Sequence, residues 1–128
     1  MREKRSGNIL IVDDEVHNLS ALERTFRREY NVFLATGGED ALSIMKQTDI
    51  TLIITDHRMP GMTGVEFLEK TLREYPDTIR IILTGYADDK TVIDAINMGH
   101  IHNCLHKPWQ PEEIRAIVRK SIQEHTAD

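Results

Sequence analysis

The stretch Ile50–Asp56, with the sequence ITLIITD, is a run of apolar and β-branched residues that ends in a carboxylate. A short run of this composition is typical of a strand that is buried on both faces of a sheet. Two similar runs also end in polar residues, since Asn8–Val12 precedes Asp13–Asp14 and Ile79–Leu83 precedes Thr84. If these runs are parallel strands, their polar end groups meet at one edge of the sheet.

An amphipathic segment follows each apolar run, so strands and helices are expected to alternate along the chain. Strands joined by helices of this kind predict right-handed crossovers and a parallel sheet with helices on both faces. The expected fold is therefore α/β, a single doubly wound sheet of five parallel strands. We expect strands at 8–12, 31–35, 50–55, 79–83 and 103–106, and helices at 16–28, around 41–45, between 64 and 75, at 88–98 and from 111 onward.

Apolar residues at helical spacing indicate which side of each helix faces the sheet. Gly99 is placed to end the fourth helix, and Pro111 suits the first turn of the fifth. The side chains expected to point inward are Leu19, Leu22 and Phe26, then Ala41, Leu42, Ile44 and Met45, then Val65, Leu68 and Leu72, then Val92, Ala95 and Ile96, and finally Ile114, Ile117, Val118 and Ile122.

The bulk composition is that of one globular domain without membrane spans. The chain has 128 residues, 40% of them hydrophobic and 29% charged, and no apolar run approaches the roughly 18 residues of a membrane helix. A net charge of −5 argues against direct nucleic-acid binding. One cysteine excludes an internal disulfide, and no apolar signal segment opens the chain, so a cytoplasmic location is expected. We expect a flexible arm at 1–7, a folded domain at 8–124 and a tail at 125–128.

The acidic residues at the strand ends predict a cation site. Two carboxylates about 4 Å apart repel each other by roughly 4 kcal/mol at an effective dielectric near 20. Lys107, which closes the short segment from 103, supplies only one positive charge against Asp13, Asp14 and Asp56. An oxygen-binding divalent ion, Mg²⁺, is the expected partner. In this arrangement Asp56 is the expected nucleophile towards a phosphoryl group, with Thr84 and Lys107 as phosphoryl ligands.

Other reactive residue types have simpler interpretations. The six histidines lack the spacing of a compact zinc site, and Cys104 is interpreted as a buried, unactivated thiol. Trp109 is expected to pack the last helix against the core, and the Lys107–Pro108 bond is a candidate for a cis peptide. The histidines are His17, His57, His100, His102, His106 and His125.

Four motifs in order make the chain resemble the CheY-like receiver domains of two-component response regulators over nearly its whole length. They are Ile9–Glu15, Thr55–Gly64, Leu83–Tyr86 and Lys107–Trp109. The resemblance implies a flavodoxin-like sheet in the order 2-1-3-4-5. It also implies a regulatory phosphoacceptor domain, not a turnover enzyme, that assists its own phosphorylation and dephosphorylation.

The resemblance assigns a role to each residue of the site. It implies that Asp56 accepts the phosphoryl group, that Asp14 and Asp56 bind Mg²⁺ directly, and that Asp13 binds it through water. Arg58 would contribute its backbone carbonyl to the metal, while Thr84 and Lys107 hold the phosphoryl group. In the family, an aromatic side chain three residues before the lysine reports on the threonine. Here that switch position is Cys104, so we expect signalling to run through backbone shifts.

The resemblance also implies partners. A sensor histidine kinase would supply the phosphoryl group. An output domain or downstream protein would bind the face formed by the fourth helix, fifth strand and fifth helix, and the resemblance allows a homodimer on phosphorylation. The motifs look like those of receivers that precede transcriptional activators or cyclic-dinucleotide phosphodiesterases. Whether the chain stands alone or is the front of a longer protein stays open at this point.

Three alternatives use the same residues differently. An Mg²⁺-dependent aspartyl phosphatase of the haloacid-dehalogenase type would have a second aspartate two residues after the nucleophile, where this chain has Arg58. An FMN-binding module of flavodoxin type would favour hydroxyls and backbone N–H groups after the first strand, where Asp13–Asp14 stand. A docking domain that has lost its chemistry would have no need of the acidic residues.

Overall fold

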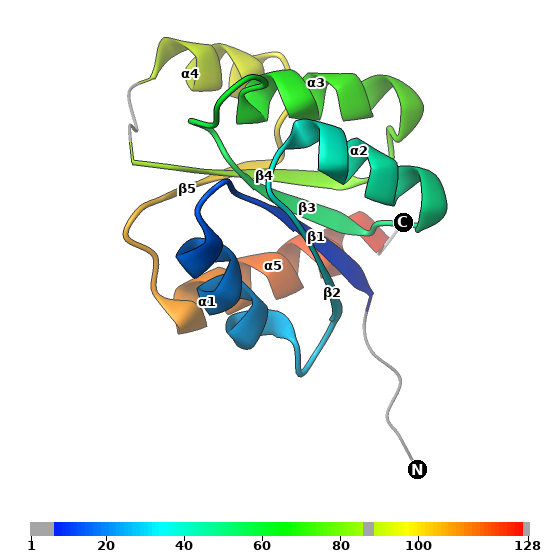
Figure 1. The fold of residues 1–128 in the computed structure, drawn as a ribbon, viewed down its shortest axis with the longest axis vertical. Helices are drawn as coiled ribbons and strands as arrows, with labels where there is room; N and C mark the ends of the chain where they lie inside the picture. The colour runs from blue at the N-terminus through cyan, green and yellow to red at the C-terminus, as the bar shows by residue number, and fades with distance from the viewer. Residues whose placement is uncertain (1–6, 86–88, 127–128) are drawn as a thin grey trace.

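The computed structural model describes residues 7–85 and 89–126, with strands and helices in alternation (Figure 1). The structure gives strands β1 Asn8–Val12, β2 Asn31–Ala35, β3 Leu52–Asp56, β4 Ile79–Thr84 and β5 Asn103–His106, and helices α1 Val16–Phe26, α2 Gly38–Gln47, α3 Gly64–Glu74, α4 Lys90–Asn97 and α5 Pro111–Thr126.

The strands form one parallel sheet in the order β2-β1-β3-β4-β5, which confirms the predicted α/β fold of flavodoxin type. Helices α1 and α5 cover one face, and α2, α3 and α4 cover the other (Figure 1). The register pairs Val12 with Thr55 and Asp56 with Leu83, so β1, β3 and β4 end at nearly the same level. The residues that follow these strands are therefore brought to one edge, which we call the C-terminal edge of the sheet.

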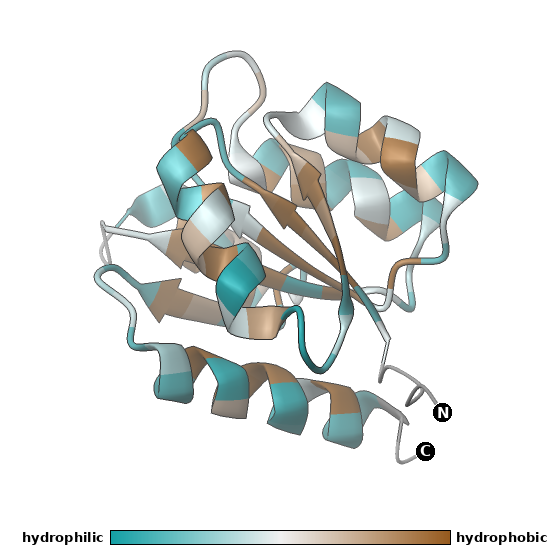
Figure 2. Ribbon diagram, turned by 60° about the horizontal axis from the view of Figure 1, so that its bottom comes forward, coloured by the Kyte–Doolittle hydropathy of each residue, from teal (hydrophilic) through white to brown (hydrophobic). Residues whose placement is uncertain are grey.

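The core has two layers, one on each side of the sheet, because successive strand residues point to opposite faces. Leu10 and Ile53 pack with α2, α3 and α4, whereas Ile9 and Ile54 pack with α1 and α5. Figure 2 shows the apolar strands enclosed by helices that are hydrophilic on their outer sides. Trp109 packs against the α1 and α5 layer, as expected from its position before α5.

Several predicted boundaries were wrong by one or two residues. Helix α1 ends at Phe26, and β3 begins at Leu52 and includes Asp56. Helix α4 begins at Lys90, and its predicted start at Asp88 lies outside the described residues. Helix α5 continues to Thr126, so it includes the first two positions of the segment 125–128 that was expected as a tail. Positions 1–6 of the expected arm and positions 127–128 lie outside the described residues.

The inward side of α4 is narrower than predicted. Val92 and Ala95 are buried, but Ile96 is 39% exposed, and the predicted burial of Ile96 is wrong. The helix has only eight residues, and Val92 and Ala95 are the two that it buries. In α3, Leu72 is only partly buried, and Phe67, which the sequence analysis did not select, fills the core.

Helix α3 starts close beneath the end of β3, and this contact requires a glycine. Thr63 and Glu66 form a capping box at the start of the helix. Gly64 donates its N–H to the carbonyl of His57 at 2.9 Å, and a Cβ at this position would overlap the carbonyl oxygen of Asp56. The backbone that carries Asp56 is thus held by the first turn of α3.

We expect Gly64→Ala to lower the free energy of unfolding by about 2 kcal/mol, because the added methyl group would overlap the backbone of Asp56 and His57 at the end of β3. Urea denaturation would measure the change. Gly37→Ala is the matched control, since a Cβ there meets nothing within 4 Å. A Gly64 variant that is no less stable than this control would contradict the packing argument.

Candidate functional site

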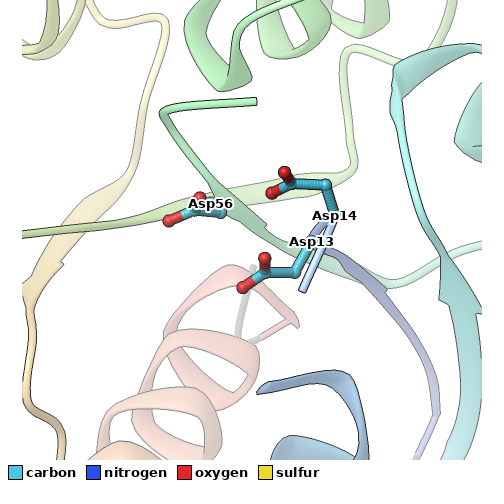
Figure 3. A group of neighbouring side chains, drawn as sticks. All are labelled: Asp13, Asp14 and Asp56. Carbon is cyan, nitrogen blue, oxygen red and sulfur yellow. The ribbon is translucent and has the colours of Figure 1, made fainter. Parts of the chain in front are cut away.

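The predicted acidic residues come together at the C-terminal edge of the sheet. One carboxylate oxygen each from Asp13, Asp14 and Asp56 lies within 4.8 Å of the others. Figure 3 shows the three side chains at the ends of β1 and β3, which are neighbours in the sheet. Asp13 and Asp56 are buried and Asp14 is exposed, so the cluster opens to solvent on the side of Asp14.

The Asp13 side chain is held in place by hydrogen bonds from two residues that follow it closely in the sequence. Its Oδ1 accepts a hydrogen bond from the N–H of Glu15 at 2.9 Å, and its Oδ2 accepts one from the Asn18 side chain at 3.2 Å. Burial is the largest influence on this carboxyl and raises its pKa, and the negative charge of Asp56 raises the pKa further. The hydrogen bonds and the positive charge of Lys107 oppose this rise without cancelling it. The protein therefore carries an electrostatic cost at Asp13 that a bound cation would relieve.

Lys107 lies directly against the predicted nucleophile. Its Nζ is 2.5 Å from Oδ1 of Asp56, and its backbone N–H donates to the carbonyl of Thr84 at 3.0 Å. The Lys107–Pro108 peptide is cis, as the sequence suggested. Lys107, Asp13 and Trp109 line a hollow of about 480 Å³ beside the acidic residues. The lysine thus balances one of the carboxylates and leaves the cluster with an excess of negative charge.

Thr84 and Arg58 complete the predicted set in different ways. Thr84 is the last residue of β4, is 2% exposed, and follows Leu83, the partner of Asp56 in the sheet. Its position at the C-terminal edge agrees with the prediction. The side chain of Arg58 is exposed and approaches Asp89 instead of the acidic cluster, with its Nη2 3.6 Å from the Asp89 carboxylate. The predicted role of Arg58 concerns its backbone carbonyl and stays a prediction.

Sequence reasoning missed three residues beside the site. Asn18 donates a hydrogen bond to Asp13. Its place in the expected first helix, five residues after a strand-ending acid, could have indicated this contact from the sequence. His57 is 5% exposed and its Nε2 lies 3.4 Å from the Asp89 carboxylate. Asp89 also accepts a hydrogen bond from the N–H of Thr91, which makes it the N-cap of α4. An acid two residues before a helical threonine is a capping signal that could have been read from the sequence.

Cys104 lies in β5, three residues before Lys107, and its thiol is not activated. It pairs with Ile82 in the sheet and packs against the α2, α3 and α4 layer, where it is partly buried. Burial raises the pKa of the Cys104 thiol, so the thiolate is disfavoured at neutral pH. This agrees with the interpretation of Cys104 as an unreactive side chain in the position of the expected switch residue.

The chemistry of the donor groups fits a hard divalent cation. Across residues 7–85 and 89–126, the acidic cluster is the only group of three or more acidic, histidine or cysteine side chains close enough to share an ion, and no histidine belongs to it. A set made only of carboxylate oxygens suits Mg²⁺ better than zinc, whose sites are built mainly from cysteine and histidine. A larger groove of about 700 Å³ lies between α2 and α3, but none of the predicted site residues lines it. Among the described helices, none has both the length and the apolar character needed to cross a membrane.

Comparison with known proteins agrees with this geometry. A model of the response regulator receiver domain matches residues 9–119. The hydrogenase transcriptional regulatory protein HoxA of Cupriavidus necator is 33% identical over 119 residues, covering 93% of this chain and 25% of that protein. Sporulation initiation phosphotransferase F of Bacillus subtilis is 34% identical over 116 residues, covering 89% of this chain and 92% of that protein.

Solved structures show the same similarity. The signal receiver domain of an HD domain-containing protein from Pseudomonas fluorescens Pf-5 matches with a TM-score of 0.90 and 30% identity, covering 98% of this chain and 100% of that one. The chain therefore spans about a quarter of the length of HoxA and the whole of a separately solved receiver domain.

Proposed function

The chain belongs to the family of response regulator receiver domains, and from that premise we propose that it is a switch driven by phosphorylation of Asp56. The phosphoryl donor is the phosphohistidine of a sensor histidine kinase. The observation that carries the proposal is the position of Asp56, which is 7% exposed and lies between two other carboxylates and the ammonium group of Lys107. The domain that performs this function is residues 8–124, and it acts in the cytoplasm.

The reaction needs little covalent help from the protein. A carboxylate oxygen of Asp56 forms the new P–O bond while the P–N bond of the phosphohistidine breaks and the imidazole leaves with the bonding electrons. Lys107, 2.5 Å from Asp56 Oδ1, places positive charge beside the phosphoryl oxygens as their charge grows. Thr84, at the neighbouring strand end, provides a hydroxyl that can donate to the attached phosphoryl group.

Mg²⁺ is the proposed cofactor. Asp14, Asp56 and the backbone carbonyl of Arg58 would bind it directly, and Asp13 would bind it through water. When bound, the ion would neutralise the carboxylates and the charge on the phosphoryl oxygens. The support for this assignment is the excess negative charge of the cluster and the raised pKa of Asp13, which burial and the charge of Asp56 produce.

The proposed output surface is the face formed by α4, β5 and α5. Ile93 and Ile96 of α4 are 40% and 39% exposed, and Met98, just after the helix, is 67% exposed. Exposed apolar side chains on one short helix are suited to protein contacts. The partner is an output domain or a downstream protein. A homodimer of the phosphorylated domain would form through the same exposed apolar side chains. This domain itself does not bind nucleic acid.

An Mg²⁺-dependent aspartyl phosphatase of the haloacid-dehalogenase type is not favoured. The position two residues after Asp56, where such an enzyme needs a general acid, holds Arg58, whose guanidinium approaches Asp89. A guanidinium stays protonated at neutral pH and cannot donate its proton to a leaving group. Asp56 would therefore be phosphorylated and slowly hydrolysed, without turnover of general phosphate esters.

The proposal is tested by incubation with acetyl phosphate, a small donor that replaces the kinase. With Mg²⁺ we expect the intact mass to increase by one phosphoryl group, and with EDTA we expect no increase. The adduct should be lost in mild base, as expected for an acyl phosphate and not for a phosphoserine. Failure to label in Mg²⁺, with the protein folded by circular dichroism, would overturn the proposed function.

A further inference from the structure

The N-cap of α4 is tied to the segment that follows Asp56. Asp89 Oδ1 accepts the N–H of Thr91 at 2.9 Å, which caps the helix. Its other carboxylate oxygen, Oδ2, lies 3.4 Å from His57 Nε2 and 3.6 Å from Arg58 Nη2. One carboxylate therefore joins two parts of the chain that are more than 30 residues apart, the start of α4 and the two residues after Asp56.

Two of the three side chains in this contact are largely shielded from water. The side chains of His57 and Asp89 are 7% and 15% exposed, whereas that of Arg58 is 62% exposed. The contact of the Asp89 carboxylate with these two side chains is therefore weakened less by solvent than one on an open surface. The ring of His57 also has a buried Nδ1 without a hydrogen-bond partner among the described residues.

An unsatisfied buried nitrogen is a cost that the protein carries in this arrangement. The ring is held where its Nε2 meets Asp89, although its second nitrogen finds no partner within residues 7–85 and 89–126. The backbone of His57 is fixed by bonds to Leu83 and Gly64 at 3.2 and 2.9 Å, so the ring is attached rigidly to the end of β3. A small shift of that backbone would change the contact with Asp89 directly.

We propose that the contact between His57 and Asp89, reinforced by Arg58, is a latch that holds the first turn of α4 in its resting position until Asp56 is phosphorylated. The inference rests on the proposed function. Attachment of a phosphoryl group and a cation beside residues 56–58 would move this backbone and release Asp89. Helix α4 carries Ile93 and Ile96 on its exposed side, so release of its first turn would alter the apolar surface that a partner meets.

Thermodynamic coupling makes the latch testable from both ends. If phosphorylation releases the latch, then breaking the latch by mutation must shift the equilibrium towards the phosphorylated state by the same factor. The labelling rate should rise as well, because the proposal places the released backbone already in the transition state of phosphoryl transfer. A partly shielded charge contact of this kind is worth a factor of about 2 to 5 in an equilibrium. A latch and a purely structural contact therefore differ in their effect on labelling at Asp56, which a structural contact would leave unchanged.

The test uses Asp89→Asn, because asparagine caps a helix as well as aspartate but carries no charge. We expect the labelling rate with acetyl phosphate and Mg²⁺ to rise about 2- to 5-fold. Amide exchange in the first turn of α4 should also be faster in the unphosphorylated variant and should change less on phosphorylation. Asp94→Asn is the matched control, since Asp94 lies in the same helix and pairs with Lys90 at 2.9 Å, away from His57. This control should behave as the wild type in both measurements.

A double-mutant cycle with His57→Gln gives a second measure. The two substitutions should be non-additive in the labelling rate, because either one breaks the same contact. Wild-type protein that is labelled normally, together with an Asp89→Asn variant that is labelled at the same rate, would overturn the latch and leave the proposed function intact. Faster exchange in α4 without faster labelling would also overturn it, as a sign of simple helix destabilisation. Absence of labelling in the wild type would remove both proposals.

Discussion

Asp56→Asn is expected to abolish uptake of phosphate from acetyl phosphate. The carboxamide has no anionic oxygen to attack phosphorus, and the next acids in the cluster are attached to β1 instead of β3. Asp13 uses both of its oxygens as hydrogen-bond acceptors, and Asp14 is exposed, whereas Lys107 pairs with Asp56. The rate should fall below detection in intact-mass spectra, a loss of at least about a thousandfold for removal of a nucleophile.

The fold should survive this substitution. Asparagine has nearly the same shape as aspartate, and the loss of the Asp56 charge has two opposing effects on its neighbours. Lys107 loses its partner at 2.5 Å, whereas Asp13 loses a negative neighbour that raises its pKa. Asp49→Asn is the matched control, since it makes the same change at an exposed position before β3 and should be labelled normally. Full labelling of the Asp56 variant would show that another side chain accepts the phosphoryl group.

The sequence was sufficient for the centre of the sheet because β1, β3 and β4 are buried on both sides. A strand such as β3 must then be apolar at nearly every position, and its first charged residue, Asp56, marks its end. The parallel order places these ends together, so Asp13, Asp14, Asp56 and Lys107 could be predicted as one site from their positions after strands. Regular crossovers leave little freedom in this part of the architecture.

Side chains whose partners are backbone groups or distant loops could not be predicted in this way. Arg80 lies within β4 and is 2% exposed, and its guanidinium donates to the carbonyls of Thr78 and His100 at 2.8 and 2.9 Å. Nothing in the sequence indicates that these carbonyls would be available. The contact between His57 and Asp89 depends similarly on how the start of α4 lies over the end of β3, which the strand pattern does not determine.

Asp13→Asn is expected to have opposite effects on stability in the absence and presence of Mg²⁺. The carboxylate oxygens of Asp13 and Asp56 lie within 4.8 Å of each other, and at an effective dielectric of 20 two charges at that limit repel by about 3 to 4 kcal/mol. The attraction of Asp13 to Lys107 and its hydrogen bonds from Glu15 and Asn18 offset most of this repulsion. In EDTA at pH 7 the variant should therefore be more stable than the wild type by about 1 kcal/mol. Urea denaturation would measure the difference.

The pH dependence has a definite sign. Folding raises the pKa of Asp13 above its usual value of 3.8, so the folded protein binds more protons than the unfolded chain in the interval between the two values. The wild type consequently loses stability as the pH rises through this interval, and the variant lacks this loss. In EDTA the advantage of Asp13→Asn should be small below pH 3.8, should grow as the pH rises through the interval, and should then remain constant.

Addition of Mg²⁺ should reverse the order of the two proteins. A ligand that binds only the folded state stabilises it according to its affinity, and loss of a residue that holds a metal through water weakens binding about 10- to 100-fold. Millimolar Mg²⁺ should then raise the free energy of unfolding of the wild type more than that of Asp13→Asn. Equal gains in both proteins would place the cation elsewhere. A variant that is less stable even in EDTA would show that the hydrogen bonds of Asp13 to Glu15 and Asn18 outweigh its repulsion from Asp56.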